Sequence, residues 1–247
     1  MSMSWFGAIV LAAALAAPSA AARPQVPGAS PAAAADTITD LPLERVPARG
    51  SPSDAMAMLV TGDGGWATLV RTVADSLAAH GMEVVALNAR RYFSTQRDPD
   101  GAARDLERVL RYYLARWGRE RVVLIGYSRG ADVMPFMASR LPADLRARVQ
   151  VIALIGPATN ANFKFHLVDL LENKRRKDDR MTVPEIEKLR GTSILCVYGK
   201  NEKDSACPAL SAGVATLVEL PGGHHFDGRY GEIATRILLA TEQAASR

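Results

Sequence analysis

The chain has 247 residues, of which 48% are hydrophobic and 23% charged, and its 30 Lys and Arg against 26 Asp and Glu give a net charge of +4. This length suits one α/β domain with a leader, and the composition excludes the disordered and fibrous classes. The basic residues are scattered and match no nucleic-acid-binding motif, so no nucleic-acid partner is expected. The mild positive charge fits either a solvated surface of mixed charge or contact with an anionic lipid head group.

The first 22 residues predict a secretory signal peptide. They carry no charged side chain, residues 5–17 are apolar, and small residues precede a cleavage position near Ala22. An uncleaved anchor is the alternative, but the apolar run is shorter than the ~20 residues of a membrane span. Residues 23–38 are rich in Ala, Pro and Ser, which predicts a flexible linker. A folded domain is therefore expected over residues 39–247, with the periplasm as its location.

Strands and helices are predicted to alternate along this domain. Helices are expected after residue 66 with a stop at Gly81, over 100–117, directly after Ser128, and over 231–244. Apolar runs predict strands at 55–60, 83–87, 121–125, 149–155, 193–198 and 215–220. Most of these runs lack alternation of apolar and polar residues, which is typical of parallel strands buried on both faces. We therefore predict an α/β fold with a mostly parallel, doubly wound sheet and helices on both faces.

A candidate nucleophile stands between a predicted strand and a predicted helix. The segment Gly126-Tyr127-Ser128-Arg129-Gly130 has the spacing of a nucleophile elbow, in which small residues two positions before and after the Ser let the strand and the helix approach. A Ser hydroxyl becomes nucleophilic only with a general base, an orienting carboxylate and backbone donors for the developing oxyanion. Ser128 is the predicted nucleophile.

The base and the acid are expected in the loops after the last two strands. His224 and His225 follow the final strand, and we expect His224 to be the base because it directly follows a glycine, with His225 as the alternative. Two carboxylates follow the strand at 193–198. We prefer Asp204, four residues before a proline, to Glu202, three residues after a glycine. The order Ser, acid, His is that of the α/β-hydrolases.

Backbone donors for an oxyanion are expected from two segments. One is the amide of Arg129, the residue after the nucleophile, and the other is the amide of Asp63 or Gly64 in the glycine-rich loop after the first strand. This loop lacks the Gly-Lys-Ser/Thr ending of a P-loop, so the alternative of a phosphate cradle is set aside.

The two cysteines predict a disulfide. An even number of cysteines in an exported protein favours a bridge between Cys196 and Cys207, and two separate buried thiols are the alternative. Their spacing does not match a zinc site, and no metal or cofactor is predicted.

A long charged segment, residues 160–190, lies between two predicted strands and has Lys174-Arg175-Arg176-Lys177 at its centre. Such an insertion either caps the substrate cleft or forms a solvated surface helix.

Several motifs together resemble the VirJ/AcvB family of bacterial virulence proteins, and the resemblance extends from about Met56 to the C-terminus. They are Thr-Gly-Asp-Gly-Gly-Trp at 61–66, Arg-Tyr-Phe at 91–93, Gly-Tyr-Ser-Arg-Gly-Ala-Asp at 126–132, Cys-Val-Tyr-Gly at 196–199, Glu-Lys-Asp-Ser-Ala-Cys-Pro at 202–208 and Gly-Gly-His-His-Phe-Asp at 222–227. The resemblance implies an α/β-hydrolase fold and a periplasmic serine hydrolase. It further implies hydrolysis of aminoacyl esters of phosphatidylglycerol, notably lysyl-phosphatidylglycerol, and a link to type IV secretion and virulence.

The implied partners are a phospholipid head group at the membrane surface and components of a type IV secretion system. Asp63, Asp132 and Asp227 are candidates to meet a cationic lysyl group, each with a purely structural role as the alternative. Two other functions remain open: a generic periplasmic esterase or thioesterase, and a non-catalytic scaffold associated with secretion.

Overall fold

The computed structural model describes residue 1, residues 38–165 and residues 178–246. Contacts divide the chain into two units, Met1–Asp36 and Thr37–Arg247, and the described helices and strands belong to the second. The predicted signal peptide and linker lie outside the described residues except at positions 1 and 38, and so does the basic run at 174–177.

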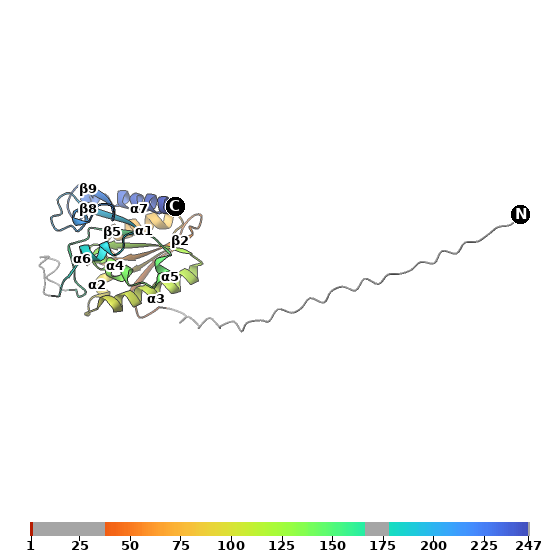
Figure 1. The fold of residues 1–247 in the computed structure, drawn as a ribbon, viewed down its shortest axis with the longest axis horizontal. Helices are drawn as coiled ribbons and strands as arrows, with labels where there is room; N and C mark the ends of the chain where they lie inside the picture. Colours follow the sequence, from red (N-terminus) through yellow and green to blue (C-terminus); the bar gives the residue numbers. More distant parts are fainter. Residues whose placement is uncertain (2–37, 166–177, 247) are drawn as a thin grey trace. The chain divides into compact units, whose positions relative to one another are not determined.

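The described unit is built on a seven-stranded sheet (Figure 1). All neighbouring strands are parallel except the first pair, which is antiparallel. The prediction of a mostly parallel sheet is therefore confirmed. The spatial order is β1 (Leu43–Val46), β3 (Val84–Leu87), β2 (Ala55–Val60), β4 (Arg121–Tyr127), β5 (Val149–Ile155), β8 (Ser193–Gly199) and β9 (Thr216–Leu220).

Alternate residues of each central strand enter two separate hydrophobic cores. In β2, Met56 and Met58 belong to one core while Ala57 and Leu59 belong to the other, and all four are at most 1% exposed. Both faces of β2 are thus buried, which explains why its sequence is a continuous apolar run.

Helices cover both faces of the sheet, as predicted (Figure 1). The apolar sides of α1 (Thr68–Ala79) and α7 (Tyr230–Ala245) pack on one face. Those of α3 (Pro99–Trp117) and α4 (Arg129–Ser139) pack on the other. The bounds of α3 follow from its ends, because the Asp98 carboxylate accepts a hydrogen bond from the Gly101 amide at 2.8 Å and Gly118 closes the helix with φ 63°.

The remaining elements are short. They are α2 (Ala89–Tyr92), α5 (Ala143–Arg146), β6 (Asn160–Ala161), β7 (Arg180–Met181), α6 (Thr182–Glu187) and the 3₁₀ turns η2 (Cys207–Ala209) and η3 (Phe226–Gly228). The described ends of the segment 160–190 therefore form a small antiparallel pair, β6 with β7, followed by α6. No helix in the described part of the chain is both long enough and apolar enough to cross a membrane.

The parallel strands end at the same edge of the sheet. The loops that follow β2, β4, β5, β8 and β9 meet there, which is where open α/β sheets bind their ligands.

Candidate active site

Ser128 occupies a strained turn between β4 and α4. Its backbone has φ 55° and ψ −124°, a conformation that costs a non-glycine residue ~1–3 kcal/mol. Its amide donates to the Ile155 carbonyl at 2.9 Å, and its carbonyl accepts from the amides of Ala131 and Asp132. The neighbouring strand and the first turn of the helix thus hold this backbone in place and direct the side chain into the loops at the sheet edge.

The two glycines around Ser128 are required by close packing. A Cβ on Gly126 would lie 2.6 Å from the Cα of Ala131, and a Cβ on Gly130 would lie 2.6 Å from the carbonyl carbon of Val60. Real Cβ atoms do not approach other heavy atoms so closely. The small residues therefore allow α4 to cross directly over β2 and β4, as their spacing predicted.

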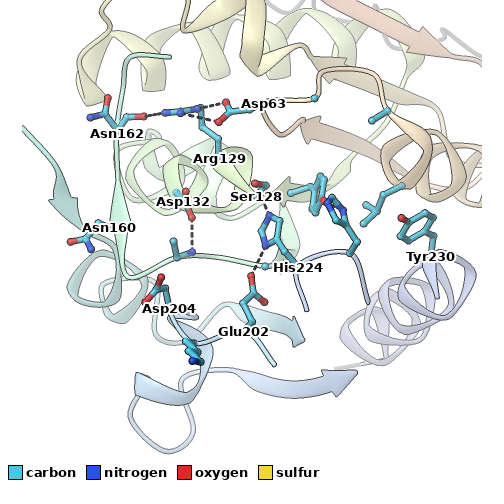
Figure 2. Close-up of a pocket in the computed structure, with 18 of the residues that line it drawn as sticks. Asp63, Ser128, Arg129, Asp132, Asn160, Asn162, Glu202, Asp204, His224 and Tyr230 are labelled. Carbon is cyan, nitrogen blue, oxygen red and sulfur yellow. Dashed lines mark hydrogen bonds and ion pairs between the residues drawn. The ribbon is translucent and has the colours of Figure 1, made fainter. Parts of the chain in front are cut away.

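Three side chains from three loops form one hydrogen-bonded chain (Figure 2). Nε2 of His224 lies 2.8 Å from Oγ of Ser128, and Nδ1 of the same ring is hydrogen-bonded to Oε1 of Glu202. The other carboxylate oxygen of Glu202 accepts from the Gly199 amide at 3.1 Å. With its proton on Nδ1, the imidazole can take the proton of Ser128, so this arrangement can generate a nucleophile.

The structure contradicts the preference for Asp204 as the partner of the histidine. Glu202, the weighed alternative, takes that place, because its amide donates to the Gly199 carbonyl at 2.9 Å in a tight turn that directs the carboxylate to His224. The main chain of Asp204 is instead paired with the loop after β5, where its carbonyl accepts from the Thr159 amide at 3.0 Å. The Asp204 side chain is exposed on the wall of the cleft.

His224 rather than His225 contacts Ser128. Burial lowers the pKa of His224, but the hydrogen bond to Glu202 and the charges of Asp132 and Asp63 outweigh this, so the net pKa is raised. Nδ1 of His225 lies 3.2 Å from the hydroxyl of Tyr127, whose ring stacks on His224 with a centroid distance of 5.5 Å. His225 and Tyr127 therefore support the position of the ring that faces Ser128.

A disulfide encloses the turn that carries Glu202. Cys196 in β8 is bonded to Cys207, their Cα atoms are 5.7 Å apart, and both residues are fully buried. The predicted bridge is confirmed. It fixes both ends of the loop that presents the carboxylate to His224.

The residue after the nucleophile anchors the loop after β2. The buried guanidinium of Arg129 forms a bidentate ion pair with Asp63, with Nη2 at 2.9 Å from Oδ2. Its Nη1 also donates to the carbonyl oxygens of Asn162 and Lys164, at 2.8 and 3.3 Å. One side chain thus connects the nucleophile, the glycine-rich loop and the segment after β5. Sequence reasoning missed this pair, since the two residues are 66 positions apart and no pattern links them.

Residues 54–245 match the family model described as bacterial virulence protein (VirJ). This chain belongs to the VirJ family. No curated protein matches the sequence.

Solved structures with the same α/β-hydrolase fold cover most of the chain. Est1E from Butyrivibrio proteoclasticus has a TM-score of 0.62 and 12% identity, covering 85% of this chain and 98% of its own. XC6422 from Xanthomonas campestris, described as an α/β serine hydrolase without lid, has a TM-score of 0.53 and 18% identity, covering 81% and 88%. MenH from S. aureus has a TM-score of 0.59 and 12% identity, covering 82% and 98%. At these identities the similarity establishes the fold alone.

Ser128 of this VirJ-family chain opens into a cleft of about 580 Å³. Ser128, His224 and Glu202 line it, as do Asp63 and Gly64 from the predicted oxyanion loop. A Cβ on Gly62 would lie 3.0 Å from Cβ of Ser128, so this loop runs directly beside the nucleophile. Within residues 38–165 and 178–246, the amides of Asp63 and Gly64 donate no hydrogen bond.

Of the three carboxylates predicted to meet a cation, Asp63 and Asp132 line the cleft, and of these two only Asp132 forms no ion pair within the described residues. Asp63 is already paired with Arg129, and Asp227 is exposed in η3 beside Gly222 and does not line the cleft. Burial raises the pKa of Asp132 to about 8, although the hydrogen bond from the Ala158 amide opposes this rise.

The segment 160–190 borders the cleft at both described ends, through Asn160, Asn162 and Asp179. Nδ2 of Asn162 donates to Oδ1 of Asp179 at 2.8 Å. No group of three or more His, Cys, Asp or Glu among the described residues could hold a metal ion.

Proposed function

We propose that this chain is an exported serine hydrolase that cleaves aminoacyl esters of phosphatidylglycerol, with lysyl-phosphatidylglycerol as the expected substrate. The observation that carries the proposal is the hydrogen-bonded chain of Ser128, His224 and Glu202 at the base of an open cleft. In this proposal the acid is Glu, so the triad is Ser-His-Glu rather than Ser-His-Asp.

Catalysis would proceed through an aminoacyl-enzyme. Oγ of Ser128 attacks the ester carbonyl while its proton moves to Nε2 of His224. The C–O bond to the glycerol of the lipid then breaks, and the proton on His224 passes to this leaving oxygen. Water then attacks the new ester and gives its proton to Nε2 of His224. The bond between the acyl carbon and Oγ of Ser128 breaks, His224 passes the proton to Oγ, and the free amino acid leaves. Glu202 holds the ring with its proton on Nδ1 and stabilises the imidazolium.

The developing oxyanion needs backbone donors. We propose the amide of Arg129 together with the amide of Asp63 or Gly64 for this role, because these residues line the cleft on the nucleophile's side. The ion pair between Asp63 and Arg129 supports this role, since it fixes the loop that would carry one donor to the residue that would carry the other.

Membership of the VirJ family and the charge of the cleft support the substrate. The described lining contains five Asp and Glu side chains against one Arg, one Lys and two His, an excess of acidic groups that would favour the cationic lysyl group over a neutral acyl group. The disulfide favours an oxidising compartment outside the cytoplasm, which supports the proposed periplasmic location. The proposed partners remain the lipid head group and components of type IV secretion.

Vesicles containing lysyl-phosphatidylglycerol test the proposal. Incubation with the wild-type protein should release lysine and leave phosphatidylglycerol, whereas the Ser128→Ala variant should release none above background. Unchanged lipid with active wild-type protein would contradict the substrate. Cleavage of short neutral esters with no lipid hydrolysis would favour a generic esterase or thioesterase. Full cellular function of Ser128→Ala would favour a non-catalytic scaffold.

A further inference from the structure

The catalytic cleft is acidic although the whole chain is basic. The chain has a net charge of +4, yet the cleft lining holds five acidic side chains against one Arg, one Lys and two His. The acidic residues are Asp63, Asp132, Asp179, Glu202 and Asp204. A concave surface with this imbalance attracts cations.

Asp132 lies one helical turn beyond the nucleophile. Its amide donates to the Ser128 carbonyl at 3.0 Å, the spacing of a helical turn, so the two residues are neighbours at the start of α4 (Figure 2). The charge of Asp132 also contributes to the raised pKa of His224, which places its carboxylate within electrostatic reach of the catalytic ring. An acyl group bound to Ser128 would therefore have this carboxyl beside it.

The other carboxylates have partners or lie farther out. Asp63 is bound to Arg129 and Glu202 to His224. Asp179 accepts a hydrogen bond from Asn162, and Asp204 is exposed on the wall.

Asp132 itself is only half satisfied. Its Oδ1 accepts from the Ala158 amide at 2.7 Å, and its Oδ2 has no hydrogen-bond partner in the described part of the chain. An ammonium group would supply both the missing donors and the missing charge.

We propose that Asp132 is the specificity-determining residue of this cleft and binds the α-ammonium group of an aminoacyl ester while its carbonyl carbon is at Ser128. This inference rests on the proposed hydrolase function and assigns the recognition of its acyl group. In an aminoacyl-enzyme the α-nitrogen is only two bonds from the carbonyl carbon, so its partner must lie beside the nucleophile, as Asp132 does. A bound cation favours the ionised form of a carboxyl that burial otherwise keeps largely protonated.

Two esters of equal size test the assignment. Glycine ethyl ester carries an ammonium group where ethyl propionate carries a methyl group. For each ester, kcat/KM is measured through ethanol release at pH 7. Because the ammonium group also activates the ester chemically, the quantity compared between variants is the ratio of the two kcat/KM values. Asp132→Asn keeps an acceptor for the Ala158 amide and removes the charge. It should lower the glycyl-to-propionyl ratio by about tenfold or more.

A matched control removes the same charge elsewhere. Asp75 on α1 has a side chain that is 61% exposed and does not line the cleft. Asp75→Asn should leave the ratio within about twofold of the wild-type value, because solvent and salt screen such a charge. An unchanged ratio in Asp132→Asn, or an equal fall in Asp75→Asn, would overturn the proposal.

The ammonium site can also be tested by inhibition of the wild-type protein, which does not depend on a variant being folded. Glycinamide should inhibit the hydrolysis of ethyl propionate more strongly than propionamide does, and equal inhibition would overturn the ammonium site. Cleavage of both esters without the expected change in ratio removes the role of Asp132 but leaves the hydrolase standing. Cleavage of neither ester removes the hydrolase function and this inference with it.

Discussion

Replacing Glu202 by Gln perturbs the hydrogen-bonded chain of Ser128, His224 and Glu202. Glu202 is the position at which the structure contradicts the sequence-based preference for Asp204. The carboxylate accepts two hydrogen bonds, one with Nδ1 of His224 and one from the Gly199 amide. A Gln side chain offers one acceptor and one donor end. If its oxygen meets His224, its NH₂ faces the Gly199 N–H. If its NH₂ meets His224, the imidazole must carry its proton on Nε2, where it cannot accept from Ser128.

The expected loss follows from this geometry. Removing the orienting charge from a Ser-His-acid set lowers kcat by about 10⁴-fold, and we expect this for Glu202→Gln acting on ethyl propionate. Asp204→Asn is the matched control, since it makes the same charge change two residues away in an exposed side chain outside the chain of hydrogen bonds. Thermal unfolding of both variants verifies that they are folded. A larger loss in Asp204→Asn than in Glu202→Gln would refute the assignment of the acid.

Four further outcomes follow from the structure. Hydrolysis of a neutral ester should decline as the pH falls through an inflection above about 6.5, because His224 must be uncharged to accept a proton and its pKa is raised. The same shift contributes stability that is fully present below pH ~6.5 and is lost as the pH rises through the folded-state pKa, which urea unfolding at several pH values measures. Replacing Cys196 and Cys207 by Ser should lower the free energy of unfolding by about 2–4 kcal/mol. It should also reduce kcat, because the turn that carries Glu202 loses the disulfide that anchors it. An unchanged kcat would contradict this anchoring role. Gly130→Ala should lower the free energy of unfolding by about 1–3 kcal/mol or more, because the added methyl meets the Val60 carbonyl, and a Tm equal to that of the wild type would contradict the packing argument.

Much of the fold is predictable from the chain because its central strands are buried on both faces. The strand at 55–60 was predicted with the bounds of β2, and the apolar run was sufficient because each of its residues enters one of two cores. The edge strand β1 was missed. Its sequence Leu-Glu-Arg-Val is short and partly charged, and only its antiparallel pairing with β3 makes it a strand.

The residues of the site likewise fall into those that the sequence predicts and those that it does not. The positions of Ser128 and His224 follow from local spacing after a strand, which a sequence displays directly. The choice between Glu202 and Asp204 depends on how the chain turns after β8 and on which backbone groups the loop after β5 offers, and neither is visible in residue spacing. The hydrogen bond from the Glu202 amide to Gly199 is the local feature that decides it.

The most direct test of the central claim is the reaction of the protein with a fluorophosphonate, followed by mass spectrometry of its peptides. This reagent modifies a Ser only when a neighbouring base activates it. We predict one adduct, on Ser128, formed far more slowly in Glu202→Gln and not at all in Ser128→Ala. Absence of an adduct on Ser128 in the folded wild-type protein, or an adduct on another Ser alone, would contradict it.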